Sequence, residues 1–149
     1  FRHIAWLAHQ HNIALQMPAS HPFNPLPLLR LAMAAAPNRR VVEALMRHVW
    51  RGGADPVDAA RIDALTRELA PARDPSSDEV KAELRANTDA AIARGVFGVP
   101  TFELDGRLFW GLEALPMLRA ALQGDPWFDG PTWDEAGRAR PGVHRLGTP

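Results

Sequence analysis

The chain has 149 residues, of which 46% are hydrophobic, and its 17 basic and 17 acidic side chains give a formal net charge of zero. This balance argues against a general role in binding nucleic acid or anionic membranes, where a basic surplus is expected, and no apolar run is long enough to span a bilayer. Because cysteine is absent, these residues form no disulfide, catalytic thiolate or cysteine-based metal site. We therefore expect a cytoplasmic domain that binds neither nucleic acid nor membrane and holds no metal.

The first residues begin in the middle of a helical pattern. The segment FRHIAWLAHQHN, residues 1–12, places Ile4, Leu7, Ala8 and His11 on one helical face. The chain also begins with Phe1 rather than Met. We expect a further segment N-terminal to Phe1.

Proline, glycine and capping residues divide the next part of the chain into helices. A short extended piece, IALQMP, precedes the proline-rich loop ASHPFNPLP, in which Pro25 or Pro27 is suited to open a helix. Four helices are predicted: LPLLRLAMAAA, which Pro37-Asn38 ends; RRVVEALMRHVWRGG, which ends at Gly52-Gly53; a third with Asp55 as N-cap and Pro56 in first position; and a fourth capped by Ser76 or Ser77 that ends at Gly95.

The pattern changes after residue 95. TFELDGRLFW alternates with period two around Asp105-Gly106, which predicts a β-hairpin, and LEALPMLRAALQG predicts a final helix with Pro116 in its first turn. Residues 125–149 are rich in proline and glycine and predict a surface tail, held in place by Trp127, Phe128 and Trp133. Because a lone hairpin is only marginally stable, we expect further strands upstream.

Pro100 stands immediately before the first predicted strand. A trans proline is tolerated at a strand start and needs no function. A cis Val99–Pro100 bond would cost only about 0.5–1 kcal/mol more than trans and would leave the N–H and C=O groups of Val99 free to pair with a peptide-like ligand. The residues alone leave both interpretations open.

Two segments, ARGVFGVPTF and DGRLFWGLEAL, resemble parts of the 2-hydroxychromene-2-carboxylate isomerases and the related kappa-class glutathione transferases. The resemblance extends through most of the chain and includes the segment HIAWLAHQHNIALQMPASHPFNPLPLLRLAMAA. It implies a helix-dominated α/β protein of the DsbA-like thioredoxin fold with an inserted all-helical domain, whose N-terminal β-α portion would lie upstream of Phe1. The implied division is a thioredoxin-like remnant and connecting loop at 1–24, the inserted helical domain at 25–94, the C-terminal thioredoxin-like part at 95–124 and a surface tail at 125–149.

The resemblance also implies a glutathione site. Val99 would offer its backbone to the cysteinyl part of glutathione, and a cis Pro100 would hold that backbone in place. The family's Trp-Gly-x-acid segment, which binds the γ-glutamyl end, matches Trp110, Gly111, Leu112 and Glu113.

General physical chemistry agrees with a γ-glutamyl site but does not require one. A helix N-terminus at Leu112-Glu113 offers free N–H groups to a carboxylate, and the Glu113 carboxylate can pair with an ammonium group. Glu113 is equally well explained as an acid in a first helical turn, and Trp110 as a core residue. Where the family commonly has an arginine after the acid, this chain has Ala114.

Phe23 and Asn24, in the loop ASHPFNP, match the region that contributes to the family's aromatic-substrate pocket. The alternative is that Phe23 packs on a helix and that Asn24 caps the helix that follows. The family's nucleophile is a serine on the loop after the first strand, which would lie upstream of Phe1. We therefore assign no residue of this chain to that role.

The resemblance implies a glutathione-dependent isomerase of the 2-hydroxychromene-2-carboxylate type, active in aromatic compound catabolism. It would act by addition and elimination of glutathione thiolate on a small aromatic or conjugated substrate, and it would form a homodimer. The alternatives are a kappa-type glutathione transferase, a DsbA-like thiol–disulfide oxidoreductase with a cysteine upstream of Phe1, and a non-catalytic helical binding module.

Overall fold

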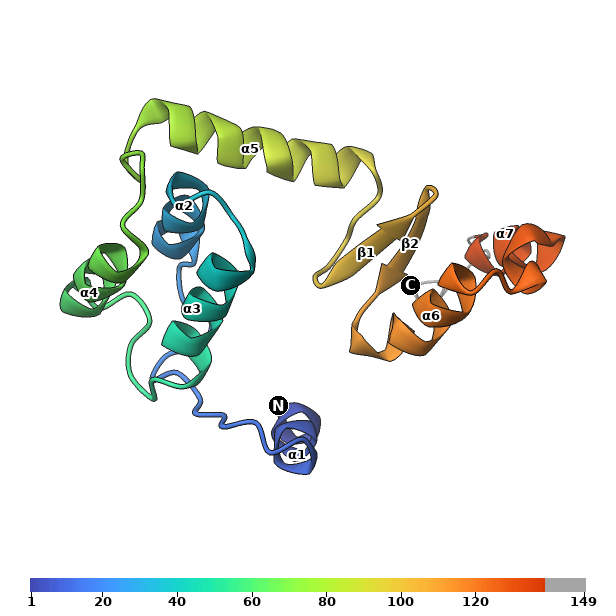
Figure 1. The fold of residues 1–149 in the computed structure, drawn as a ribbon, viewed down its shortest axis with the longest axis horizontal. Helices are drawn as coiled ribbons and strands as arrows, with labels where there is room; N and C mark the ends of the chain where they lie inside the picture. The colour runs from blue at the N-terminus through green and yellow to red at the C-terminus, as the bar shows by residue number, and fades with distance from the viewer. Residues whose placement is uncertain (139–149) are drawn as a thin grey trace, which may run out of the picture. The chain divides into compact units, whose positions relative to one another are not determined.

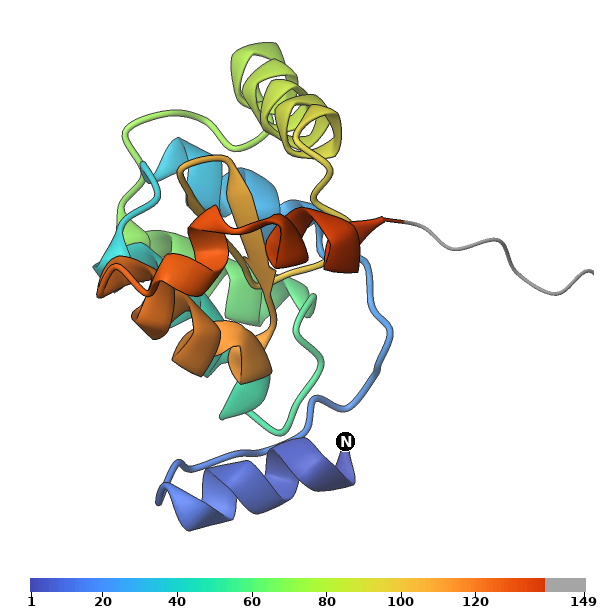
Figure 2. The same cartoon turned by 90° about the vertical axis from the view of Figure 1, so that its right-hand side faces the viewer.

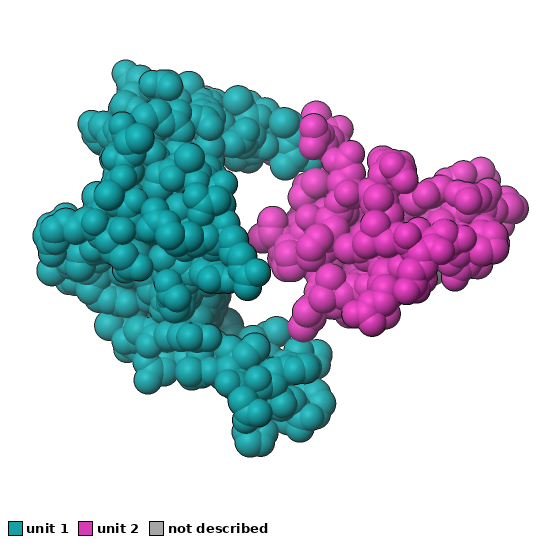
Figure 3. Space-filling view, in the orientation of Figure 1, with its two compact units in different colours: residues 1–91 teal, residues 92–149 magenta. Residues whose placement is uncertain are grey.

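The computed structural model describes residues 1–138 of the chain (Figure 1). The elements in chain order are α1 (Arg2–Gln10), α2 (Leu26–Ala34), α3 (Arg39–Trp50), α4 (Ala59–Leu69), α5 (Asp78–Ala93), β1 (Thr101–Leu104), β2 (Arg107–Trp110), the 3-10 helix η1 (Leu112–Ala114), α6 (Leu115–Leu122), the 3-10 helix η2 (Pro126–Asp129) and α7 (Pro131–Gly137). They form two compact units, Phe1–Ala91 and the residues from Ile92 onward (Figure 3). Among the described residues, no helix is both long and apolar enough to cross a membrane.

Unit 1 is built on the packing of α2, α3 and α4. Its main core consists of Leu28, Leu31, Val41, Ala44, Val49, Leu65 and Leu69. A second cluster, in which Met33 and Ala34 of α2 meet Val80 and Leu84 of α5, attaches the fifth helix. Helix α1 is set apart from α2–α4 by an extended stretch of chain (Figures 1 and 2), and Ala8 is its buried residue.

Side-chain caps explain where α3, α4 and α5 begin. Asn38 accepts a hydrogen bond from the Val41 N–H at 3.1 Å. The prediction that Asp55 caps the next helix is wrong: Asp58 caps it by accepting from the Arg61 N–H at 3.0 Å, and Asp55 instead closes a turn by accepting from the Val57 N–H. Both carboxylates thus satisfy nearby N–H groups, and the helix starts at the second one.

The two candidate caps of α5 have different roles. The Ser77 hydroxyl accepts from the Val80 N–H at 3.3 Å and so caps the helix. The Ser76 N–H and hydroxyl both donate to Asp74, and these hydrogen bonds lower the pKa of that carboxyl group.

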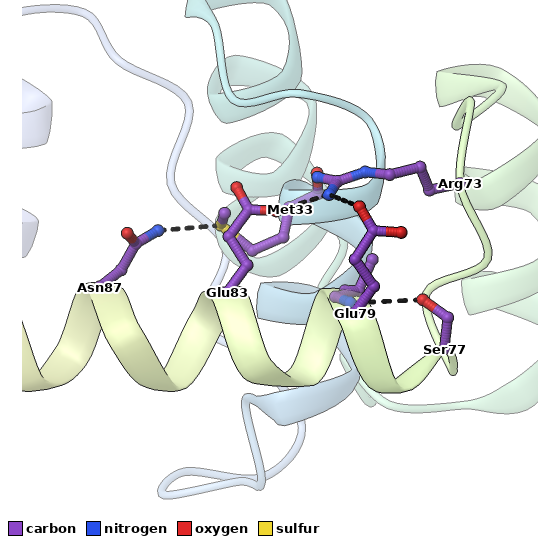
Figure 4. A network of polar contacts seen from close by, with 7 residues as sticks. Met33, Arg73, Ser77, Glu79, Glu83 and Asn87 are labelled. Carbon is purple, nitrogen blue, oxygen red and sulfur yellow. Dashed lines mark hydrogen bonds and ion pairs between the residues drawn. The ribbon is translucent and has the colours of Figure 1, made fainter.

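Arg73 fixes the loop that precedes α5 (Figure 4). Its guanidinium donates to the C=O of Met33 in the last turn of α2 and pairs with Glu83 and Glu79 of α5. The hydrogen bond with Glu83 is the main reason why the pKa of Arg73 is raised. One side chain therefore joins three segments of unit 1.

Unit 2 is built around the predicted hairpin. The two-residue loop has positive φ at both Asp105 (51°) and Gly106 (78°), as the tight primed turns of hairpins require. The register pairs Thr101 with Trp110 and Leu104 with Arg107. Phe109 of β2 is fully buried, and it packs with Ala114 and Phe128 in a core that also includes Leu104, Leu118, Ala120, Ala121 and Trp133.

The residues after α6 differ from the predicted irregular tail. They form η2 and α7, each with proline in its first turn, so α6 is not the final helix. Phe128 is buried, and Arg107 of β2 donates to its C=O at 3.0 Å and to the Asp129 carboxylate at 2.9 Å. The rest of the predicted tail, 139–149, lies outside the described residues.

Candidate functional site

The turn between α5 and β1 presents an unpaired stretch of backbone. The Val99–Pro100 peptide bond is cis, and the Thr101 hydroxyl closes the turn by donating to the Gly98 C=O at 2.6 Å. The Val99 side chain is 85% exposed. Within residues 1–138, neither the N–H nor the C=O of Val99 makes a hydrogen bond. This residue can therefore pair with the backbone of a bound molecule.

Trp110 lies beside this turn because the pairing of the two strands extends beyond the last residue of β2 to the residue that precedes β1. The Gly111 N–H donates to the Pro100 C=O at 2.9 Å, one step beyond the Thr101–Trp110 pair. The indole lies against Gly98, where a Cβ atom would come within 2.5 Å of Nε1. Trp110 is 46% exposed, so it is a surface aromatic rather than a core residue.

Phe97 also belongs to this turn, although the sequence pattern did not single it out. Its ring lies 5.0 Å from that of Trp110 between centroids, and its side chain is 77% exposed. An exposed aromatic beside free backbone groups often marks a binding surface. Its position two residues before Val99 in GVFGVP was the available signal.

Gly111 and Glu113 form the other half of this region. Gly111 has φ +88°, and its missing side chain leaves room for the Glu113 carboxylate, which a Cβ atom would approach to within 2.5 Å. The chain then enters the 3-10 helix η1, and α6 begins only at Leu115. Among the described residues, the N–H groups of Leu112 and Glu113 have no acceptor and the Glu113 carboxylate has no ion-pair partner.

Ala114, where the resemblance implied an arginine, is buried against Phe109 and Phe128. Its side chain therefore faces the core of unit 2 rather than the exposed Glu113 carboxylate. A long cation at this position would disrupt that core.

The six residues predicted to bind a cofactor thus come together around the Pro100–Gly111 hydrogen bond; they are Val99, Pro100, Trp110, Gly111, Leu112 and Glu113. They combine unpaired amide groups, a free carboxylate and exposed apolar surface. This combination suits a small ligand with a peptide backbone and a cationic amine. Thr101 carries the hydroxyl nearest to this turn in sequence, and it donates to the Gly98 C=O.

The two residues predicted to bind substrate lie in unit 1. Phe23 lines an apolar cavity of about 320 Å³ between α2 and α3, together with His21, Met46 and Trp50. Asn24 accepts from the Leu26 N–H at 3.1 Å and so closes a turn just before α2, whose N-cap is Pro25. Across residues 1–138, no three His, Asp or Glu side chains gather as a metal site would require.

These features define a helix-rich α/β chain with a proline turn and hairpin that can receive a peptide-like ligand. Residues 1–123 match the family described as DSBA-like thioredoxin domain, and the chain belongs to that family. The predicted fold class, a DsbA-like thioredoxin fold dominated by helices, is confirmed.

The relatives of the chain include 2-hydroxychromene-2-carboxylate isomerases. The isomerase of Pseudomonas sp. (strain C18) is 45% identical over 51 residues, which cover 34% of this chain and 24% of that protein. A solved structure of 2-hydroxychromene-2-carboxylate isomerase (HCCA isomerase) superposes with a TM-score of 0.66 at 24% identity, over 80% of this chain and 62% of that one. The chain thus spans only part of each relative, and the resemblance found in the sequence is confirmed.

Proposed function

We propose that this chain carries the glutathione-binding part of an isomerase of the 2-hydroxychromene-2-carboxylate type. The observation that carries the proposal is that unit 2 has both the free backbone of Val99 and the unpaired Glu113 carboxylate, on the two segments that the Pro100–Gly111 hydrogen bond joins. The names of the similar proteins support the isomerase class.

The chemical groups of glutathione match those that the turn leaves unpaired. The Val99 N–H and C=O can pair with the cysteinyl backbone as a neighbouring strand would. The N–H groups of Leu112 and Glu113 can donate to the γ-glutamyl carboxylate, and the Glu113 carboxylate can receive the α-ammonium in a charge-assisted hydrogen bond. Gly111 permits this arrangement because a side chain there would occupy the space of the Glu113 carboxylate.

When bound, glutathione supplies a nucleophilic thiol that can add to a conjugated carbon and leave again, which allows geometry at a double bond to change. The residues of this chain hold and orient it. The proposed substrate is a small aromatic or conjugated molecule.

A thiol–disulfide oxidoreductase is the second candidate, because the matching family is described as DSBA-like. An extended substrate peptide could use the Val99 backbone just as glutathione would, but a peptide strand has no α-ammonium for Glu113 unless it carries a γ-glutamyl group. The role of Glu113 therefore separates the two candidates.

The decisive test is isothermal titration of reduced glutathione into the chain and its Glu113→Gln variant. We expect Glu113→Gln to weaken binding by roughly ten- to a hundredfold, since a charge-assisted hydrogen bond contributes roughly 1.5–3 kcal/mol. Glu135→Gln, which removes an exposed carboxylate of α7 in the same unit, is the matched control and should bind like the unaltered chain.

A variant of the ligand tests the same pairing from the other side. Glutaryl-Cys-Gly lacks the α-ammonium of glutathione, so it should bind the unaltered chain weakly and lose nothing further in Glu113→Gln. Equal affinity of glutathione for the unaltered chain and Glu113→Gln would overturn the assignment of Glu113, and the absence of glutathione binding would overturn the proposed function.

A further inference from the structure

A charged groove lies in unit 1, between α2 and the middle of α5. It encloses about 320 Å³. Arg30 of α2 and Lys81 and Arg85 of α5 line it with positive charge, and Leu26 and Leu84 give it apolar walls. Lys81, Leu84 and Arg85 share one helical face of α5, and Leu84 packs on the Met33–Val80 cluster that joins the two helices.

Arg30 differs from every other half-buried arginine among residues 1–138. Arg61 donates to the C=O groups of Asp55 and His48, Arg73 pairs with carboxylates of α5, and Arg107 pairs with Asp129. Arg30 has no hydrogen bond or ion pair within that range, and its Nε atom is buried without a partner. Leaving a buried charged donor unpaired is costly.

No neighbouring acceptor relieves this cost. Arg30 also lines a smaller cavity of about 220 Å³ with Thr66 and Ser76, whose hydroxyls donate to the Ile62 C=O and to Asp74 and accept no hydrogen bond from Arg30 within residues 1–138. The rest of the guanidinium likewise has no partner within residues 1–138, and since Arg30 lines the groove, a group that enters the groove from solvent can pair with it.

We propose that the groove between α2 and α5 binds a small organic carboxylate, with the carboxylate on Arg30 and Arg85 and an apolar body against Leu26 and Leu84. A guanidinium presents a planar fork of donors that matches a carboxylate. The site is distinct from the one formed by Val99 and Glu113 and does not depend on the proposed glutathione binding.

The charges around the groove favour a single negative charge over a phosphate dianion. Asp89 also lines the groove and repels anions. The Lys81 ammonium already forms an ion pair with the Asp78 carboxylate, with 3.0 Å between Nζ and Oδ1. Thr88 donates to the Leu84 C=O and offers no further proton. Of the three cations that line the groove, Arg30 and Arg85 are thus the two without a partner among the described residues. Two guanidinium groups are enough to neutralise and hold one carboxylate.

The test is titration of the chain with benzoate, followed by two-dimensional NMR and calorimetry. Benzyl alcohol serves as a neutral ligand with the same ring, and inorganic phosphate as an anion without an apolar body. The variants are Arg30→Met, which keeps an unbranched apolar stem in place of the unpaired guanidinium, and Arg85→Gln on the exposed face of α5. Arg119→Gln, an exposed arginine of α6, is the matched control.

We expect saturable benzoate binding that Arg30→Met weakens about tenfold or more, that Arg85→Gln weakens by a smaller factor, and that Arg119→Gln leaves unchanged. Benzyl alcohol and phosphate should bind more weakly than benzoate. The proposal is overturned by any of three results: no benzoate binding at millimolar concentration, equal binding of benzyl alcohol, or benzoate binding that survives both Arg30→Met and Arg85→Gln. Because Arg85→Gln alters a surface residue, it tests the site even if Arg30→Met fails to fold.

Discussion

The backbone conformation at position 111 requires glycine. With φ +88° and ψ 169°, this residue occupies a conformation that is essentially restricted to glycine. The absent Cβ also makes room for the Glu113 carboxylate. One residue therefore sets both the direction of the chain after β2 and the position of the proposed ligand group.

We predict that Gly111→Ala lowers the free energy of unfolding by about 1–3 kcal/mol, because alanine is strained in this backbone conformation. Urea unfolding followed by tryptophan fluorescence measures the loss. Gly137→Ala in α7 is the control: no atom lies within 4 Å of the position that its Cβ would take and its φ is not positive, so stability should be unchanged or slightly higher. Equal effects of the two substitutions would contradict the assignment.

Helix α3 contributes side chains both to the core of unit 1 and to the apolar cavity. Its sequence predicts an apolar stripe of Val42, Leu45, Met46, Val49 and Trp50, and all five line the apolar cavity that includes Phe23. The face with Val41, Ala44 and Val49 packs in the core of unit 1. The adjacent valines thus have different exposed fractions, 0% for Val41 and 44% for Val42.

We predict that Val41→Ala lowers the free energy of unfolding by about 2 kcal/mol, since it removes two buried carbon atoms and leaves a cavity. Val42→Ala makes the same chemical change one residue away and should cost less than about 1 kcal/mol. Denaturant unfolding of both variants compares them directly. If the order were reversed, the described orientation of α3 would be wrong.

Most elements could be predicted from local chemistry, and the misses have identifiable causes. The hairpin follows from Asp105-Gly106 because few sequences tolerate two positive φ values in succession. The start of α4 could not be chosen, because Asp55 and Asp58 both have a capping side chain. The Asp55 C=O is held by Arg61, a contact that local sequence does not reveal.

The helices after α6 were missed for a different reason. Proline and glycine in DPWFDGPTW suggest a loop, but proline is also favoured in the first turn of a helix. What decides between the two is the burial of Phe128 against Phe109, a contact between residues far apart in the chain. Periodicity within the segment carries no such information.

At the scale of the whole molecule, the two kinds of candidate residue belong to separate units with separate cores. The predicted cofactor residues lie in unit 2 and the predicted substrate residues in unit 1. The resemblance of two short motifs identified the predicted cofactor residues. These residues lie close together because the hairpin pairs the segment that starts at Pro100 with the one that ends at Gly111. The unpartnered Arg30 was not foreseeable, since sequence does not show which arginines lack an acceptor.

The central claim is that unit 2 binds glutathione through the backbone of Val99 and the region of Glu113. The most direct measurement is a two-dimensional ¹H–¹⁵N NMR titration of the chain with reduced glutathione. We predict saturable shifts that are largest at the amides of Val99, Leu112 and Glu113, with the Asn38 amide of unit 1 unaffected. Saturable shifts confined to unit 1, or no saturable shift at those three amides, would contradict the account.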